Sequence, residues 1–139
     1  MSFLIDTNVI SELRKGDRCA PRVWKWRQSV ALEDMFTSVL VIGEIRRGIE
    51  EKRARDPVST RVFKKWLDQL QSVHRNRILP VTVEICDVWG RLSVRSPLPP
   101  IDGLLAATAI FHNLTLVTRN ITDVKRSGAR CLDPFVPQT

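Results

Sequence analysis

The chain has 139 residues, of which 43% are hydrophobic and 27% are charged. This is the composition of one globular domain with a single core, and it excludes a disordered tail and a membrane protein. Lys and Arg number 22 against 15 Asp and Glu, so the formal net charge is +7, which favours a polyanionic partner or an acidic protein partner.

The cysteine content indicates a reducing environment. The chain has an odd number of cysteines, Cys19, Cys86 and Cys131, and no Cys-x-x-Cys pair. We therefore expect no disulfide scaffold and a cytoplasmic location. With only His74 and His112 available, a structural zinc site is not expected. We also expect no membrane contact, because the chain start lacks a signal pattern and the longest apolar run is far shorter than the about 20 residues that span a bilayer.

The first half of the chain is predicted to contain two strands, each followed by a helix. A short apolar strand at 2–5 ends in Asp6, and a helix opens near Asn8. The next predicted elements, in order, are a helix at 21–30 with Pro21 in its first turn, a strand at 35–38 and an amphipathic helix at 39–54.

The second half continues the alternation. Its predicted elements are a helix at 58–74, a strand at 78–81, helices at 83–94 and 101–112, a strand at 115–118, a short helix or turn at 121–127 and a last strand at 129–132. Strands that alternate with helices imply right-handed crossovers, so we predict one three-layer α/β/α domain over 1–139 with a central, mainly parallel sheet. No glycine-rich nucleotide-binding motif is present.

Two acidic residues follow predicted strands. Asp6 comes directly after the first strand, and Asp123 comes shortly after the strand at 115–118. Ligands of open α/β sheets bind at the carboxyl ends of the strands, so both residues are candidates for a site. Either could instead be a helix cap or a turn residue, which is a common role for Asp at such junctions.

Two more acidic residues lie beside apolar helix faces. Glu44 has Leu40 and Ile45 as helical neighbours. Asp102 stands in the first turn of a helix that is otherwise nearly all apolar. A carboxylate in such surroundings is costly unless a cation or hydrogen-bond donors meet it. The alternatives are an ion pair of Glu44 with Arg47 and an interaction of Asp102 with the helix dipole.

These four acids together predict a metal site. Strand ends and the starts of the following helices can bring Asp6, Glu44, Asp102 and Asp123 to one sheet edge. Their charges then require protonation or divalent cations, and oxygen ligands without His or Cys point to Mg²⁺ or Mn²⁺. Such a site inside a basic surface suits phosphodiester hydrolysis. A haloacid-type phosphatase is the alternative, but it usually needs Asp-x-Asp after the first strand, and here Asn8 takes the third place.

Four segments match a known family pattern, namely 4–8, 38–48, 102–109 and 116–120 followed by Asp123. In this order and spacing they resemble the PIN-domain ribonucleases, specifically the VapC-type toxins of bacterial toxin–antitoxin pairs. The resemblance covers nearly the whole chain. One departure is Val124, where the family usually has Phe, so we expect looser packing beside Asp123.

The resemblance implies a metal-dependent endoribonuclease that cuts single-stranded RNA. Its acidic quartet maps onto the four acids named above, and the hydrogen-bonding positions around that quartet map onto Thr7, Ser38, Thr118 and Asn120. It also implies a homodimer and an antitoxin partner whose C-terminal segment plugs the acidic groove, often with an arginine. Two other functions stay open: a catalytically silent module of the same fold that binds RNA or protein, and a PIN nuclease of general RNA processing.

Aromatic and basic residues alternate at Trp24 and Trp26. Positions i and i+2 of a helix point to nearly opposite sides, so the two indoles cannot both be core. One of them is therefore available for base stacking or a partner, or lies flat on the surface. The basic run at 46–55 is expected to be a solvated helix face.

Overall fold

The computed structural model describes residues 1–138. Its strands are β1 (Phe3–Ile5), β2 (Met35–Ser38), β3 (Ile78–Leu79), β4 (Thr115–Val117) and β5 (Cys131–Leu132). Its helices are α1 (Thr7–Leu13), α2 (Pro21–Gln28), α3 (Val39–Arg53), α4 (Pro57–Val73), α5 (Val83–Arg95), α6 (Pro100–His112) and α7 (Ile121–Lys125). The predicted alternation is confirmed, with element ends that differ by at most two residues. Three short 3₁₀ helices, at Gly16–Arg18, Leu32–Asp34 and Arg75–Arg77, were not predicted.

The five strands form one parallel sheet in the order β3-β2-β1-β4-β5. The central strand β1 is buried along its whole length and pairs with β2 on one side and β4 on the other. Apolar residues without polar alternation suit such a strand, because helices cover both faces of a parallel sheet. The α/β/α fold class is therefore confirmed, whereas the single domain over 1–139 stays a prediction that extends one residue beyond the described chain.

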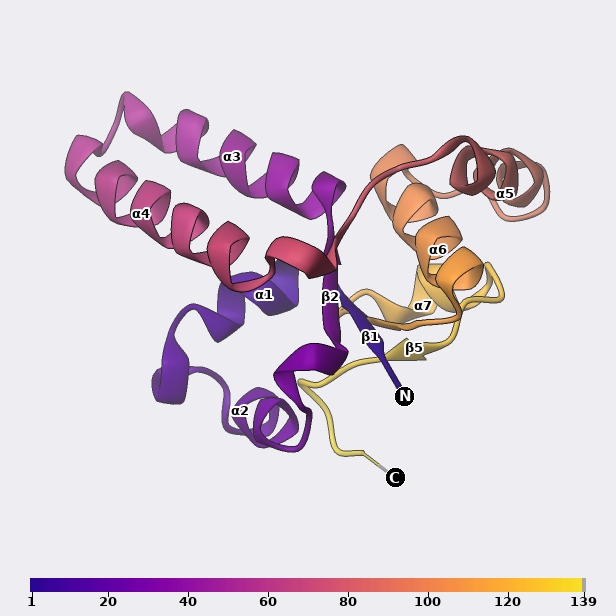
Figure 1. Ribbon diagram of the computed structural model, residues 1–139, viewed down its shortest axis with the longest axis horizontal. Helices are drawn as coiled ribbons and strands as arrows, with labels where there is room; N and C mark the ends of the chain where they lie inside the picture. Colours follow the sequence, from indigo (N-terminus) through magenta and orange to yellow (C-terminus); the bar gives the residue numbers. More distant parts are fainter. Residues whose placement is uncertain (139) are drawn as a thin grey trace.

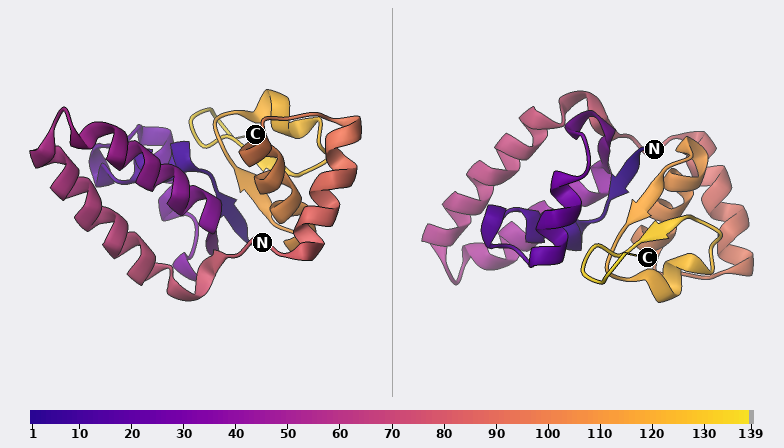
Figure 2. Two further views of the ribbon diagram at one scale, coloured as in Figure 1. Left: turned by 90° about the horizontal axis from the view of Figure 1, so that it is seen from above. Right: turned by 90° about the horizontal axis from the view of Figure 1, so that it is seen from below.

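Helices cover the two sides of the sheet in chain order. Helices α1 to α4 lie on one side of the strands, and α5 to α7 lie on the other (Figures 1 and 2). Right-handed crossovers explain this division, because the chain moves outward from β1 to β3 and then returns across β1 to β4 and β5. The core joins both sides, with Leu4, Leu67 and Leu116 almost fully buried.

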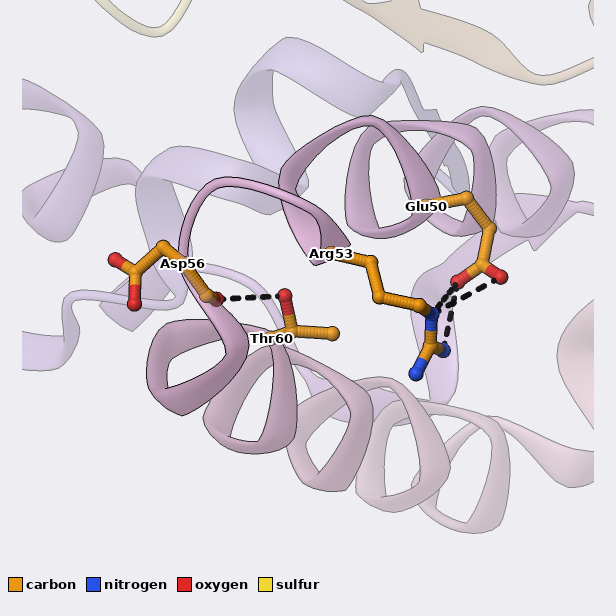
Figure 3. A network of polar contacts seen from close by, with 4 residues as sticks. All are labelled: Glu50, Arg53, Asp56 and Thr60. Carbon is orange, nitrogen blue, oxygen red and sulfur yellow. Dashed lines mark hydrogen bonds and ion pairs between the residues drawn. The ribbon is translucent and has the colours of Figure 1, made fainter.

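The turn between α3 and α4 is held by local polar contacts (Figure 3). The carbonyl of Asp56 accepts a hydrogen bond from Thr60 Oγ1 at 2.8 Å, and its carboxylate caps α4 by accepting from the Ser59 N–H at 3.0 Å. Arg53 and Glu50 pair at 2.8 Å on the surface, where such pairs contribute little stability. The hairpin packs α4 against α3, which carries Glu44.

Close packing of α5 against α6 depends on a glycine. A Cβ at Gly103 would lie only 3.0 Å from Nε1 of Trp89, so any larger residue would push the indole away. Gly103 follows Asp102 directly, and the contact therefore fixes the first turn of α6.

The two tryptophans of α2 have different environments, as predicted. Trp26 is buried with its ring edge-on to Phe3, whereas Trp24 is half-buried rather than exposed. Within residues 1–138, every helix is too short or too polar to cross a bilayer.

Candidate active site

The direction in which the chain adds strands to the sheet reverses at β1, and the candidate site lies at this point. After β1 the chain continues to β2 on one side, and it returns much later to β4 on the other side. Ligands of open α/β sheets bind at such a switch point, beyond the carboxyl ends of the strands. Asp6 follows β1 directly and Thr118 follows β4 directly, so the two lie side by side at this edge.

Asp6 is the most firmly held of the four acids. Its side chain is buried, with 8% of its surface exposed. Oδ1 accepts a hydrogen bond from the Thr7 N–H at 2.7 Å, and Oδ2 accepts one from Thr118 Oγ1 at 2.8 Å. The helix-cap alternative is therefore also correct, because Asp6 caps α1. The two roles are compatible, since the cap uses one oxygen and fixes the direction of the other.

Glu44 joins the same network from α3. It is half-buried and accepts a hydrogen bond from Thr7 Oγ1 at 2.5 Å. The alternative ion pair with Arg47 is wrong, because Arg47 points to Glu51 and pairs with it at 3.2 Å. Thr7 thus links two acids, with its backbone N–H on Asp6 and its hydroxyl on Glu44.

Asp102 lies in the first turn of α6. Partial burial raises the pKa of its carboxyl, and the negative charges of Asp6, Glu44 and Asp123 raise it further. Asp102 therefore lies within electrostatic reach of three acids that come from distant parts of the chain. The interaction of a first-turn acid with the helix dipole would lower the pKa, so it is not the dominant effect at Asp102.

Asp123 is the least tightly bound member. It lies in the first turn of α7 and forms an exposed pair with Arg126 at 3.5 Å. Val124 beside it is buried in the core, with 2% of its surface exposed. Asp123 is therefore near enough to affect Asp102 electrostatically but is also partly compensated by Arg126.

The predicted supporting residues fall into two groups. Thr7 and Thr118 donate directly to the acids, as described above. Ser38 instead caps α3 by accepting from the Leu40 N–H at 3.1 Å. Asn120 is exposed, and it contributes its backbone N–H to Thr118 Oγ1 at 3.1 Å.

Asn8 belongs to the site but was not predicted as a site residue. Its Nδ2 donates to Thr118 Oγ1 at 3.4 Å, and its Oδ1 accepts from the Arg119 N–H at 3.2 Å. It therefore ties α1 to the loop after β4 and holds Thr118 in position. The sequence feature that indicates this role is the position of Asn8 two residues after Asp6, at the same edge of the sheet.

The donor chemistry of the site suits a hard cation, although no ready-made cage is present. Among residues 1–138, no three His, Cys, Asp or Glu side chains lie close enough together to hold a metal ion as they stand. Asp6, Glu44 and Asp102 also have no Lys or Arg partner within ion-pair distance in this part of the chain. The side chains of all three acids offer carboxylate oxygens, which are the ligands that hard cations prefer.

The raised pKa of Asp102 predicts a pH dependence of stability in EDTA. A carboxyl whose pKa is raised in the folded state favours folding while it is protonated. Its full contribution to stability is therefore present only below its ordinary pKa of 3.8, and it is lost as the pH rises through the raised pKa. We expect Asp102→Asn to melt a few degrees above the unaltered chain at pH 7, and this difference to disappear below the ordinary pKa. Thermal melts across this pH range test it. A difference independent of pH would contradict the electrostatic cause.

Known proteins resemble this chain in sequence and structure. A sequence model of the PIN domain matches residues 3–125. Toxin FitB of Neisseria gonorrhoeae is 32% identical over 140 residues, which cover 96% of this chain and 98% of FitB. Ribonuclease VapC14 of Mycobacterium tuberculosis is 35% identical over 68 residues, which cover 49% of this chain and 65% of VapC14, just under two thirds. The crystal structure of FitAcB from Neisseria gonorrhoeae superposes with a TM-score of 0.86 at 27% identity, covering 96% of this chain and 98% of the matched chain.

Proposed function

Because the chain belongs to the PIN domain family, we propose that it is an endoribonuclease toxin that cuts single-stranded RNA with the aid of Mg²⁺. The observation that carries this proposal is that Thr7 hydrogen-bonds to both Asp6 and Glu44 at the switch point of the sheet, where their charges raise the pKa of Asp102. None of these three acids has a basic partner in residues 1–138. An uncompensated cluster of this kind is costly to the fold, so its presence favours a role in binding a cation.

Asp6, Glu44 and Asp102 would hold the ion, and Asp123 would assist. Mg²⁺ usually keeps several waters and contacts only one or two carboxylates directly, so it does not need the three-ligand group that is absent here. Mn²⁺ takes the same oxygen donors. When bound, such an ion polarises the phosphodiester and lowers the pKa of a coordinated water.

The protein's own contribution is to hold the acids in fixed positions. Thr118 and the Thr7 N–H fix both oxygens of Asp6, and the Thr7 hydroxyl fixes Glu44. Asp102 enters from the opposite side of the sheet on α6, so a phosphate at this edge would lie between acids from two layers. The net charge of +7 favours the approach of RNA to this acidic centre.

We also propose a protein partner. FitB is described as a toxin, and a toxin of this type would be held inactive by an antitoxin. An arginine of that partner could neutralise the acids that lack a basic neighbour in the described chain. A homodimer and a cytoplasmic location complete the proposal. The location is supported by Cys19, Cys86 and Cys131, which are all free thiols.

A catalytically silent module that only binds RNA or protein is the second candidate. The observation that favours it is the absence of a preformed three-ligand metal group in residues 1–138. Added metal is expected to produce RNA cleavage by the nuclease and none by the silent module.

The test is cleavage of RNA by the purified chain, freed of any co-purified partner. Labelled single-stranded and duplex RNA of the same sequence would be incubated with Mg²⁺ or with EDTA. We expect cuts within the single strand in Mg²⁺ and none in EDTA. Folded protein that leaves tRNA and rRNA fragments intact in Mg²⁺ and Mn²⁺ would contradict the nuclease and favour the silent module.

A further inference from the structure

A groove of about 400 Å³ adjoins the acidic site between α1, α3 and α4. Thr7 and Glu44 line both the groove and the acidic site, so the two are continuous. Ile45 and Ile49 of α3 contribute apolar lining, and Trp66 of α4 adds an aromatic side chain. This volume lies in the range of natural ligand sites, which begins at about 300 Å³.

Two cations in the groove are held against one aromatic ring. The guanidinium of Arg14 and the ammonium of Lys52 each lie 4.4 Å from the ring centroid of Phe63. Both side chains are exposed, and within residues 1–138 neither forms an ion pair with an acid. Cation–π contacts therefore hold two unneutralised positive charges at the groove.

Two other charged residues of the groove, Lys15 and Glu12, neutralise each other. Lys15 pairs with Glu12 at 3.1 Å, and the second oxygen of Glu12 accepts from the Ala20 N–H at 2.9 Å. The free positive charge of this groove therefore comes from Arg14 and Lys52. Both line the same groove as Glu44, whose negative charge would by itself repel an RNA strand.

We propose that Arg14 and Lys52, positioned on Phe63, bind the RNA backbone next to the bond that is cut. This inference rests on the proposed function and adds a subsite to it. Unpaired cations recognise phosphates, and the half-buried Trp66 lines the same groove, where an aromatic side chain suits contact with a base. The free charges beside a phosphodiester site favour RNA over a protein partner as the occupant.

The experiment measures RNA binding without cleavage. A fluorescent single-stranded RNA would be titrated in EDTA at several salt concentrations with the unaltered chain and with the double variant Arg14→Gln/Lys52→Gln. We expect the Kd to rise at least about tenfold and the log–log salt slope to become shallower by about 1.4, since each phosphate contact to a single strand contributes about 0.7. Phe63→Leu keeps apolar volume but removes the ring, and we expect it to weaken binding several-fold.

The matched control is Arg61→Gln/Lys64→Gln, which removes the same charge from exposed positions of α4 outside the groove. We expect its effect on the Kd to be within about threefold, because it removes only long-range attraction. Equal losses in both double variants, or unchanged binding in the groove variant, would overturn the subsite and leave the groove to a protein partner. Circular dichroism would establish that each variant is folded. A chain that binds RNA through the groove but cuts none would contradict the proposed function and leave the subsite standing.

Discussion

Asp6→Asn is expected to reduce RNA cleavage by roughly a thousandfold while the fold stays intact, because about 4 kcal/mol of lost metal-assisted stabilisation corresponds to three factors of ten. The amide keeps an oxygen that can accept from the Thr7 N–H, and Asn caps helices about as well as Asp. The asparagine lacks the negative charge that would bind the cation. Initial cleavage rates in Mg²⁺ and thermal melts measure the two properties separately.

The matched control is Asp56→Asn. Asp56 also caps a helix, α4, but it is exposed and lies at the far turn of the α3–α4 hairpin. We expect cleavage within a factor of two of the unaltered chain. An Asp6→Asn protein that cuts RNA at the normal rate would remove Asp6 from the catalytic assignment.

Thr118→Val is the second substitution with a large expected effect. Thr118 is fully buried, donates to Asp6 Oδ2 and accepts from the Asn120 N–H, so the isosteric valine leaves both of these groups without a partner. We expect a loss of about 1–3 kcal/mol in the free energy of unfolding, the usual cost of unsatisfied groups. We also expect a fall of about tenfold in cleavage rate, because Asp6 loses one of its two fixed contacts.

The control variant Thr37→Val separates the loss of stability from the loss of cleavage rate. Thr37 is equally buried on the neighbouring strand β2, but its hydroxyl donates at 3.3 Å to the Ile5 carbonyl and not to an acid. We expect a measurable loss of stability, by urea unfolding, with cleavage nearly unchanged. If both variants lose cleavage equally, the effect of Thr118 comes from stability alone, and a positioning role is wrong.

Most of the fold follows from the alternation of short apolar strands with helices. The strand that ends before Asp6 and the amphipathic helix that carries Glu44 were predicted almost to the residue, since both have strong local patterns. The short 3₁₀ helices were missed because three-residue turns have no periodicity. The strand at 78–81 was predicted two residues too long at its end, because its partner β2 stops at Ser38, opposite Leu79. The strand at 129–132 was predicted two residues too long at its start, because it begins only at Cys131.

The candidate site was predictable in its members but not in its contacts. Acids in apolar surroundings are conspicuous in sequence, and Asp102 is one of them. Which donor meets Glu44 depends on the angle between α1 and α3, so the contact from Thr7 could not be read from helical neighbours. Arg47 instead pairs with Glu51, four residues later on the same helix, which is a local contact that helical spacing allows. The tie from Asn8 to Thr118 joins residues 110 positions apart and is likewise a tertiary effect.

The most direct test of the central claim is the location of a bound ion. Crystals of the partner-free chain would be soaked in Mn²⁺, which replaces Mg²⁺ at oxygen sites and is visible by anomalous scattering. We predict a manganese peak in contact with Asp6 and at least one of Glu44 and Asp102, and no such peak in Asp6→Asn. Manganese-saturated crystals with no ion at any of the four carboxylates would contradict the account.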